Sequence, residues 1–505
     1  MAADDGEGNH VVHDHKHGSS HHHFLVVSYG IQSHVNPGRV LAHRLVRLGG
    51  GVTNNNGSSI LATLAVPVAT HRRMFPSLAG GANETTTTDG VISYVPYSNG
   101  FDDGSTPKSP EEWDRSSRAT SRSLSALLTR FAAGGRPVTC VVCTLMVPGV
   151  LDVVREHGIP LAVYWIQPAT VLATYYHYFH GYGELIATAA AAMDPTYEVS
   201  LPGLGLGRCR PLRVRDLPSY LVDSHTDDAE TTNKFLWELY EYMDQWRPRV
   251  LVNTSYELEA AALTEMERHL DIFPIGPVVR SSAAEDLPAR IHLFKHDDVD
   301  KKRYMDWLRA HRDKTVVYMS FGSITKCTKL QMEEVVQGLQ RCGWPYLLVV
   351  RKDGLEEDDD GLQEMITTQD DEMGMVVDWC EQLEVLSHPA VGCFVTHCGW
   401  NSTLEAVVSG VPIVGVPKTF DQPTSMYLME VEWTIGVRGE CDSEGVLMGT
   451  ELARCIEMVM GEGTTATAMR ERAGAMKEMA RETADAGGPA ERNLRDFVTT
   501  FQAHT

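Results

Sequence analysis

Residues able to bind an anion cluster in one stretch, HPAVGCFVTHCGWNSTLEAVVSGVP, at residues 388–412. The apolar run 391–395 has the composition of a central parallel strand. The polar turn THCGWN follows it, and the pair Ser402 and Glu405 forms a capping-box pattern that predicts a short helix ending at Gly410. Free backbone N–H groups and the helix dipole point outward where a strand leads into a helix, and α/β folds bind anions there. The stretch therefore predicts a phosphate site.

The turn supplies side chains as well as backbone donors. Three of its residues can donate hydrogen bonds, and one lets the backbone approach a ligand closely: His397, Asn401 and Ser402, and Gly399. A zinc site is the alternative, with these ligands: His388, Cys393, His397 and Cys398. It is weaker because Cys393 lies inside the predicted strand, adjacent residues cannot easily bind one tetrahedral ion, and the spacing matches no standard Cys/His module. We therefore expect no metal.

A second strand-to-helix turn, MSFGSITKCTKLQ at residues 319–331, repeats the pattern. Its strand ends in Phe-Gly-Ser, and Ser323 with the neighbouring amides could bind a second phosphate. A helix is predicted to begin near Thr328, with Gln331 completing another capping box. Phe-Gly-Ser is a common turn, so this motif taken alone is more simply explained as structural.

Apolar β-rich runs alternate with helical patterns after residue 22, which is typical of βαβ units and parallel sheets. A first series of strands is expected at residues 23–28, 59–66, 90–96, 138–143, 160–166 and 249–254. A second series is expected at residues 315–323, 346–350, 374–379, 391–396 and 412–417. Two of the helices between strands are expected at residues 37–48 and 110–131. The fold class is therefore α/β, with two Rossmann-like domains facing each other across a cleft.

The composition shifts along the chain predict where these domains begin and end. We expect a disordered His-rich tail at residues 1–22, an N-terminal domain at 23–268 and a linker at 269–300. A C-terminal domain should follow at 301–464. The helical segment 465–505 has no strand after it, so we expect its last helix to pack back on the N-terminal domain.

Bulk composition limits the classes of function. The 505 residues are 43% hydrophobic and 22% charged, and the formal net charge of −23 argues against a nucleic-acid partner. The sequence has neither a transmembrane run of about 18 apolar residues nor the apolar segment of a secretory signal. The ten cysteines show no repeated spacing and fit reduced thiols. We therefore expect a cytoplasmic, monomeric protein with small-molecule ligands and no stable membrane insertion.

The segment WCEQLEVLSHPAVGCFVTHCGWNSTLEAVVSGVPIVGVPKTFDQ, residues 379–422, resembles the plant secondary-product glycosyltransferase box in length and at most positions. That box is the donor-binding signature of family-1 UDP-dependent glycosyltransferases, which have the two-domain GT-B fold. Residues 32–45, 251–263 and 273–279 extend the resemblance over nearly the whole chain after the tail. The sequence VYWIQPATVLATYYHYFHGY, residues 163–182, is most similar to the indole-3-acetate, crocetin and anthocyanin 5-O glucosyltransferase group.

The resemblance implies a role in binding a UDP-sugar for each of these box positions. Trp379 would stack on uracil, while the backbone of Cys380 would read the edge of the base. Glu405 would accept hydrogen bonds from both ribose hydroxyls, helped by Gln382. Four residues would hold the diphosphate as its charge grows: Ser323, His397, Asn401 and Ser402. No divalent cation is expected, because the helix N-terminus supplies positive potential.

At the sugar end the sequence departs from the family pattern. Asp421 and Gln422 would bind sugar hydroxyls, and Trp400 would close over the sugar ring. Beside them, however, KTF at residues 418–420 replaces the usual Gln-Trp-Thr or Gln-Trp-Ser, and Glu381 replaces a proline. UDP binding is therefore better supported than a preference for glucose over galactose, xylose or glucuronate.

The chemistry implied by the family is inversion, in which an acceptor oxygen attacks the anomeric carbon opposite the departing UDP. His34, expected in the loop after the first strand, matches the family base. Thr144 stands where most relatives have an aspartate that orients this base, and a hydroxyl cannot stabilise imidazolium as a carboxylate does. A carboxylic-acid acceptor with a pKa of ~4–5 is already ionised at pH 7. We therefore expect a glucose ester of an acid such as indole-3-acetate, with a flavonoid or phenolic O-glucoside as the alternative.

Aromatic residues in ATYYHYFHGY indicate where an acceptor could bind. Tyr175, Tyr178 and Phe179 have the spacing of one helix face and could line a pocket for a flat apolar molecule. Core packing is an equally reasonable interpretation, because aromatic residues are core residues first.

Two other functions are also compatible with parts of the sequence. An NAD-dependent oxidoreductase would need a glycine-rich turn, but PGLGLGRC at residues 202–209 neither follows a clear strand nor opens a helix. A non-catalytic UDP-sugar-binding protein is the other possibility, because Thr144 replaces the expected aspartate.

Overall fold

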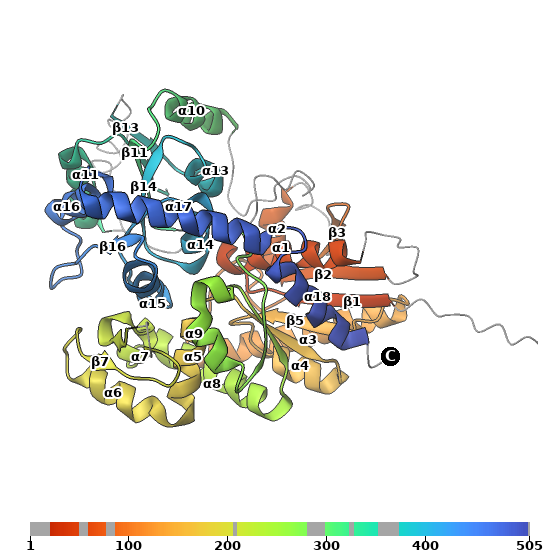
Figure 1. Ribbon diagram of the computed structural model, residues 1–505. Coiled ribbons are helices and arrows are strands. Elements are labelled where there is room, and N and C mark those ends of the chain that lie inside the picture. The colour runs from red at the N-terminus through yellow and green to blue at the C-terminus, as the bar shows by residue number, and fades with distance from the viewer. Residues whose placement is uncertain are drawn as a thin grey trace, which may run out of the picture.

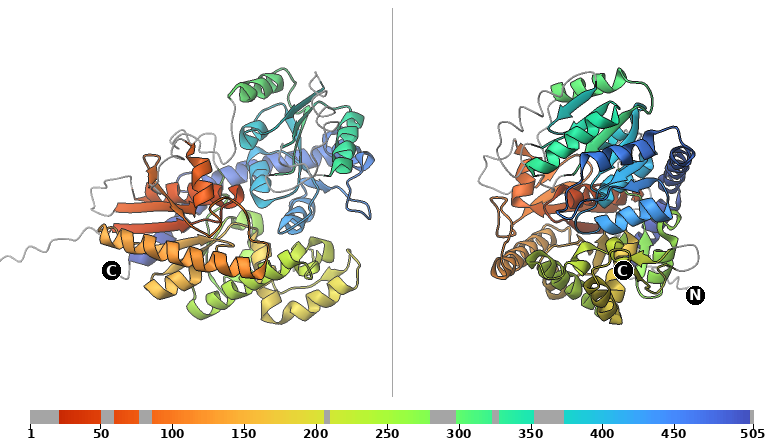
Figure 2. Two further views of the ribbon diagram at one scale, coloured as in Figure 1. Left: turned by 180° about the vertical axis from the view of Figure 1, so that it is seen from behind. Right: turned by 90° about the vertical axis from the view of Figure 1, so that its left-hand side faces the viewer.

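The computed structural model describes residues 21–49, 59–76, 86–205, 210–279, 298–322, 328–351 and 373–502. These residues form two α/β domains, one above the other in Figure 1, and the two views of Figure 2 show the same arrangement. Ser323 and residues 1–20, the greater part of the expected tail, lie outside the described residues.

The N-terminal domain is built on an eight-stranded sheet with the order β10-β9-β6-β5-β1-β2-β4-β3. Its strands are β1 (His21–Val27), β2 (Ser59–Pro67), β3 (Thr87–Thr88), β4 (Ser93–Tyr97), β5 (Cys140–Thr144), β6 (Leu161–Trp165), β9 (Arg249–Val252) and β10 (Asp271–Pro274). All neighbours pair in parallel except β3 and β4. Every residue of β5 and β6 is buried, which explains why these strands are continuous apolar runs.

Helices cover both faces of this sheet. They are α1 (Gln32–Leu48), α2 (Val68–Met74), α3 (Pro110–Ala133), α4 (Val150–His157), α5 (Ala169–His177), the π-helical turn η2 (Tyr178–Tyr182), α6 (Gly183–Ala191), the 3-10 turn η3 (Val214–Asp216), α7 (Ser219–Val222), α8 (Asp227–Trp246) and α9 (Tyr256–Met266). A small antiparallel pair, β7 (Glu198–Val199) and β8 (Leu212–Arg213), lies between α6 and η3 in the chain.

The C-terminal domain has a parallel six-stranded sheet with the order β13-β12-β11-β14-β15-β16. Its strands are β11 (Val316–Ser320), β12 (Tyr346–Val349), β13 (Gly374–Val377), β14 (Val391–Thr396), β15 (Ile413–Gly415) and β16 (Gly436–Arg438). Its helices are α10 (Asp298–Arg309), α11 (Lys329–Cys342), α13 (Gln382–Leu386), α14 (Trp400–Ser409), α15 (Gln422–Tyr427), the π-helical turn η4 (Leu428–Glu432) and α16 (Gly449–Met460). The strand expected to feed the phosphate site, β14, is fully buried in the middle of this sheet.

The last two helices connect the domains. Helix α17 (Thr464–Ala484) packs on α14 and leads into α18 (Pro489–Gln502), which lies on the N-terminal domain in Figures 1 and 2. The ring of Phe497 on α18 is centred 6.0 Å from that of Phe24 and 5.7 Å from that of Phe273. This contact buries the apolar face of α18 on the sheet of the other domain.

The observed boundaries differ from the expected ones at three places. Strand β1 begins at His21, so the expected tail ends two residues too late. Helix α1 begins at Gln32 rather than at Pro37, which lies inside it. Strand β10, at residues 271–274, belongs to the N-terminal sheet, so this domain continues past residue 268. The short strands β3, β7, β8, β10 and β16 were not expected from the sequence.

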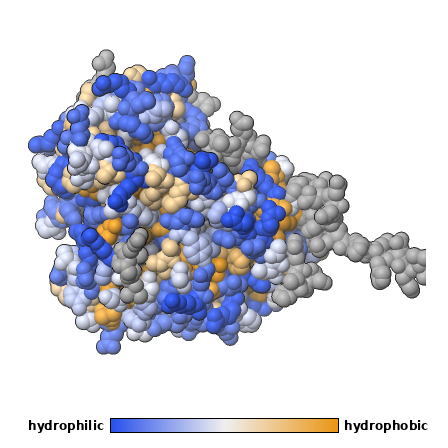
Figure 3. Space-filling view, viewed as in Figure 1, coloured by the Kyte–Doolittle hydropathy of each residue, from blue (hydrophilic) through white to orange (hydrophobic). Residues whose placement is uncertain are grey.

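The hydropathy of the surface and of the described helices is as expected from the bulk composition. Hydrophilic side chains cover much of the face shown in Figure 3, with apolar side chains scattered among them. No helix within the described ranges is both long and apolar enough to cross a membrane.

Candidate active site

A cleft of ≈ 940 Å³ separates the two domains. The carboxyl ends of parallel strands in both sheets meet there, as expected for ligand sites in α/β folds. In the N-terminal sheet, Val27 pairs with Cys143, so Thr144 and the turn after β1 reach one edge together. In the C-terminal sheet, Ser320 pairs with Thr396, which places the turns after β11 and β14 side by side.

His34 and Thr144 meet at the N-terminal edge of the cleft. The Nδ1 atom of His34 lies 3.3 Å from Oγ1 of Thr144, and the backbone N–H of Tyr29 donates to the same oxygen at 3.2 Å. His34 lies in the first turn of α1, not in a loop, so the expectation of a loop residue was wrong. Burial lowers the pKa of His34 to about 3, and a backbone hydrogen bond with Leu145 opposes that shift only in part. The imidazole is therefore neutral and a weak base at physiological pH.

Ser402 and Glu405 do not form the expected capping box. Helix α14 begins at Trp400 with Gly399 as its N-cap, and it has no side-chain capping hydrogen bond. The side-chain amide of Gln382 donates instead to Oγ of Ser402 at 2.8 Å and to Oε2 of Glu405 at 2.6 Å. The two residues therefore face the cleft together with Gln382, the residue that the family resemblance pairs with Glu405. The helix does end at Gly410, as expected, with a left-handed C-cap.

Burial sets the charge state of Glu405. It raises the pKa of this carboxyl to about 7, the hydrogen bond from Gln382 opposes the shift, and the nearby Glu381 adds to it. Because burial without enough donors disfavours the carboxylate, a ligand that supplies hydroxyl donors would stabilise its charged form. Ribose hydroxyls have the required chemistry.

His397 lies where the two C-terminal turns meet. A Cβ on Gly322 would be 2.5 Å from Cε1 of His397, and one on Gly399 would be 2.6 Å from its Nε2. Only glycine at both positions leaves room for the ring. Burial lowers the pKa of His397 to about 4, so the ring is neutral. A neutral imidazole and the N-terminus of α14 together form a site able to donate hydrogen bonds to phosphate.

Asn401 crosses the cleft to the N-terminal domain. Its side-chain amide donates to the backbone carbonyl of Ser33 at 2.9 Å. Pro37 has no N–H, so the helical hydrogen bond that would otherwise occupy this carbonyl is missing. The proline that appeared to start α1 thus leaves an acceptor free for a contact between the domains.

Trp379 and Cys380 line the C-terminal side of the cleft. The thiol of Cys380 is buried and lies 3.3 Å from the hydroxyl of Tyr318, and burial raises its pKa to about 12. This thiol therefore stays protonated.

Asp421 belongs to the segment expected to bind the sugar, and it lines the cleft. Burial raises its pKa to about 6, and its Oδ2 atom has no hydrogen-bond partner among the described residues. The side chain of Gln422 is largely used within its own loop, where Oε1 accepts from the backbone N–H groups of Lys418 and Thr419. The expectation that Gln422 binds sugar directly fits this geometry less well than the same expectation for Asp421.

Trp400 is buried where the two domains meet at the cleft. Its ring is 3% exposed, and its indole N–H donates to the backbone carbonyl of Asn253 in the N-terminal domain at 2.9 Å. Its backbone instead forms a hydrogen bond with the Asp421 carboxylate. The side chain therefore holds the two domains together beside the sugar end of the cleft.

Of the three aromatic residues expected in an acceptor pocket, Tyr175 lines the cleft. Tyr178 and Phe179 belong to the π-helical turn η2 and are half-buried against the core. The helix changes its geometry after His177, so the expected common face breaks there. Phe179 stacks behind Tyr175, with ring centres 6.2 Å apart.

Several acceptor-side residues of the cleft were missed. These are Tyr29, Ile31, Trp113, Leu145, Met146, Ile166, Tyr220 and Leu236. Leu145 and Met146 directly follow Thr144, so the turn already singled out carried a signal for them. The others come from segments far apart in the chain, and no local pattern marks them.

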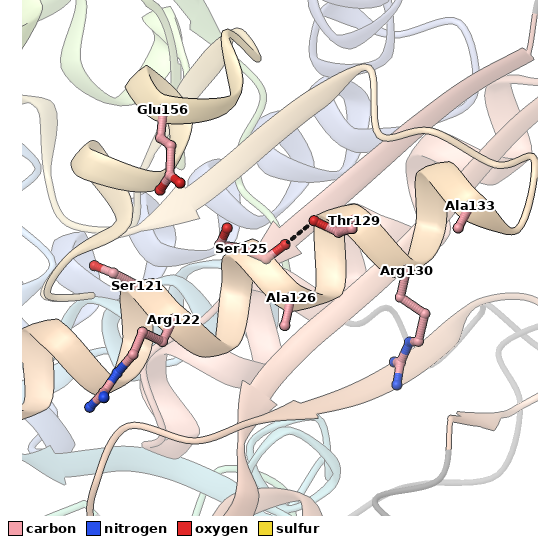
Figure 4. A pocket seen from close by; sticks show the side chains of 8 residues that line it. All are labelled: Ser121, Arg122, Ser125, Ala126, Thr129, Arg130, Ala133 and Glu156. Carbon is pink, nitrogen blue, oxygen red and sulfur yellow. Dashed lines mark hydrogen bonds between the residues drawn. The ribbon is translucent and has the colours of Figure 1, made fainter.

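A second hollow, of ≈ 610 Å³, lies on the outer face of the N-terminal domain between α3 and α4. Figure 4 shows Arg122 and Arg130 pointing away from Glu156, and the dashed line joins Thr129 to Ser125 of its own helix. Charged side chains do not converge on one point here, so the hollow has no ligand-binding constellation comparable to the cleft.

Metal binding has no support in the described part of the chain, where no group of three or more His, Cys, Asp or Glu side chains is placed to hold an ion. Cys393 and Cys398 are fully buried, and burial raises the pKa of both thiols.

Sequence comparisons with known proteins indicate the family of this chain. Residues 285–463 match the family model described as UDP-glucoronosyl and UDP-glucosyl transferase. The chain is 37% identical over 482 residues to crocetin glucosyltransferase, chloroplastic, of Gardenia jasminoides, covering 94% of this chain and 96% of that protein. It is 36% identical over 493 residues to phloretin 4'-O-glucosyltransferase of Malus domestica, covering 94% and 97%.

Comparison with solved structures indicates the same family. The crystal structure of Os79 from O. sativa in complex with UDP superposes with a TM-score of 0.76 at 28% identity, covering 95% of this chain and 100% of that one. The fold is therefore GT-B, the architecture of enzymes that transfer sugars from nucleotides. The chain belongs to the plant family-1 UDP-glycosyltransferases and is a glycosyltransferase. This result excludes the NAD-dependent oxidoreductase.

Proposed function

We propose that this enzyme transfers glucose, with inversion, from UDP-glucose to the carboxylate of a small apolar or aromatic plant metabolite such as indole-3-acetate. The product would be a glucose ester. Both relatives described above are named as glucosyltransferases, which supports glucose as the sugar. The box residues would bind the donor as the family pattern implies, with Trp379 on the uracil and Glu405 on the ribose.

The proposed acceptor class depends on the properties of the candidate base, His34. His34 has a pKa lowered to about 3 by burial, and behind it stands the hydroxyl of Thr144 rather than a carboxylate. A phenol with a pKa of ~10 must lose its proton to react, and a weak base helps little. A carboxylic acid has already lost its proton at neutral pH, so this arrangement suits it better.

The proposed step needs no proton transfer. One oxygen of the acceptor carboxylate forms a bond to the anomeric carbon of glucose, while the bond from that carbon to the diphosphate oxygen breaks. The electron pair leaves with UDP, whose new charge would be stabilised by the N-terminus of α14 and by donors such as His397 and Asn401. In this scheme His34 orients the acceptor rather than deprotonating it.

The acceptor would bind in the N-terminal half of the cleft. That half is lined mainly by apolar and aromatic side chains, among them Trp113, Met146, Ile166 and Tyr175. Such a lining suits a flat hydrophobic molecule that presents one polar group to His34.

O-glucosylation of a phenol is the second candidate, and the name of the Malus domestica relative favours it. In that reaction His34 would accept the phenolic proton as the new bond forms.

Product analysis separates these functions. The purified full chain, UDP-glucose and a panel containing indole-3-acetate and a flavonoid would be incubated, and the products identified by mass spectrometry before and after mild alkali. We expect an alkali-labile glucose conjugate of the acid, because esters hydrolyse and glycosidic ethers of phenols do not. Efficient glucosylation of the flavonoid with no ester product would overturn the proposal, and so would absence of any acceptor-dependent UDP release.

A further inference from the structure

The loop at residues 418–422, which borders the sugar end of the cleft, is held by a short helix of the other domain. The backbone N–H of Ser219 donates to the carbonyl of Phe420 at 3.0 Å. In return, the backbone N–H of Phe420 donates to Oγ of Ser219 at 2.8 Å. In Figure 1 the helix concerned, α7, lies facing α15, into which the loop leads. This reciprocal pair ties the two domains at one residue of the loop.

The conformation of Phe420 makes this tie significant. Its φ of 59° is left-handed, a region that residues with a Cβ atom avoid unless surrounding contacts hold them there. The contacts here are the two hydrogen bonds to Ser219 and the ring of Tyr220, which meets the Phe420 ring edge to face at 5.0 Å. The backbone of the loop is therefore set by α7 as well as by the loop's own sequence.

The residue that follows Phe420 is Asp421, whose Oδ2 atom is buried without a partner among the described residues. A left-handed residue reverses the chain direction locally, so the conformation of Phe420 decides where the Asp421 carboxylate points. On the other side, the side chain of Gln422 closes the loop on the backbone of Lys418 and Thr419. The loop is thus held at both ends, and Asp421, whose unpartnered Oδ2 atom is buried, lies between them among the residues that line the cleft.

We propose that Ser219 of the acceptor-side domain is a positioning residue for the transferred sugar. It acts through Phe420, holding the 418–422 loop so that Asp421 meets the sugar hydroxyls. The Tyr220–Phe420 ring pair, both members of which line the cleft, forms the partition between the sugar and the acceptor. This inference rests on the proposed binding of a UDP-sugar in the cleft and assigns part of its sugar recognition to the opposite domain.

A purely structural role for Ser219 makes a different prediction. If its hydrogen bonds served only to dock the domains, their loss would affect UDP and UDP-glucose equally, because both ligands need the same domain arrangement. If these hydrogen bonds position the 418–422 loop, their loss should leave the affinity for UDP unchanged, because UDP has no sugar to contact Asp421. The ratio of the two affinities is therefore the informative quantity.

The test compares three variants of the full chain by calorimetry with UDP and with UDP-glucose. Ser219→Ala removes the hydroxyl acceptor, and Ser219→Thr retains one. The matched control is Thr424→Val, which removes a hydrogen bond of the same kind between the domains, from Oγ1 of Thr424 to the carbonyl of Asp216 at 2.7 Å. Thr424 lies outside the 418–422 loop, so loss of this hydrogen bond should not move Asp421.

We expect Ser219→Ala to weaken UDP-glucose binding about 3- to 10-fold, the effect of losing one hydrogen bond, with UDP binding changed less than about 2-fold. The KM for UDP-glucose should rise in parallel. Ser219→Thr should restore the wild-type ratio, and Thr424→Val should leave it unchanged. Equal losses for both ligands in Ser219→Ala, or no loss, would overturn the positioning role alone. A wild-type chain that binds neither ligand would overturn the proposed function, and this inference with it.

Discussion

The two walls of the cleft are built in opposite ways. The donor wall comes almost entirely from one continuous segment, residues 379–422, and it presents carboxylates whose pKa values are raised by burial: about 7 for Glu405 and about 6 for Asp421. The acceptor wall is assembled from segments scattered over the N-terminal domain, and its histidine, His34, has a pKa lowered to about 3. Both shifts have burial as their main cause, but their consequences differ.

On the donor wall, the raised pKa values of Glu405 and Asp421 mean that the protein's own hydrogen-bond donors do not fully offset the cost of burying these carboxylates. Sugar and ribose hydroxyls can supply those donors, so ligand binding relieves the cost of burial. On the acceptor wall, a depressed histidine pKa means that a charged imidazolium is disfavoured. The donor wall is therefore suited to recognise hydroxyl groups, and the acceptor wall to hold an apolar molecule without becoming charged.

Replacement of His34 tests the acceptor wall and should give the largest effect. For a phenolic acceptor, His34→Ala should lower the rate about 10²-fold, the low end of the usual contribution of a general base, because burial makes this imidazole a weak base. For indole-3-acetate, which arrives ionised, the loss should stay below about 10-fold. Initial rates with saturating UDP-glucose on both acceptors measure the difference.

The control for this prediction is His157→Ala. His157 lies on α4, outside the cleft, where its ring contacts Ser125 at 2.6 Å. This variant should leave the rates on both acceptors unchanged. If His34→Ala lowers both rates by the same factor, the distinction between the two acceptor classes fails.

Replacement of Glu405 tests the donor wall. Glu405→Gln should weaken UDP-glucose binding about 10- to 100-fold, because hydrogen bonds to a charged group are each worth ~1.5–3 kcal/mol. The sign of the pH dependence follows from the raised pKa of about 7: as the pH falls, Glu405 becomes protonated and loses acceptor capacity. Wild-type affinity should therefore fall about 4-fold between pH 8 and pH 6.5, as the ionised fraction of a group with this pKa does.

Calorimetry with UDP-glucose at these two pH values provides the measurement. Both values lie above the pKa of about 6 of Asp421, which limits its contribution. Affinity should be flat in Glu405→Gln over the same range. A variant that keeps the wild-type slope would show that another group titrates.

The same contrast explains how much the sequence alone could predict. Apart from Ser323, which lies outside the described residues, the residues predicted for the donor wall all line the cleft, because they are local in sequence and their strand and helix, β14 and α14, follow ordinary patterns. Most strands of both sheets were also found within a few residues. The acceptor wall was found only at His34, Thr144 and Tyr175, since tertiary folding brings together segments such as those of Trp113 and Tyr220 that share no local signal.

The errors in the prediction have physical causes of the same kind. Pro37 suggested a helix start, since proline favours the first helical turn, but Asn401 uses the carbonyl that the proline leaves open and α1 begins earlier. Ser402 and Glu405 suggested a capping box, but Gln382 from another helix binds both side chains. In each case a contact distant in sequence outweighed a local rule.

Replacement of Thr144 by aspartate should give the smallest effect and would sharpen the contrast most. A carboxylate next to Nδ1 of His34 would stabilise imidazolium, so Thr144→Asp should raise activity on a phenol by about 3- to 10-fold while activity on indole-3-acetate changes less than about 2-fold. The backbone N–H of Tyr29 already donates to this position, so a carboxylate there gains a donor rather than lying unpaired. Thr144→Asn, which is similar in shape but uncharged, is the control and should not raise either rate. The added carboxylate acts through the proton on His34, and only the phenol must lose a proton there. An equal gain on both acceptors would therefore mean that His34 does more than orient the acid, and the acceptor wall would have to be regarded as a general-base site.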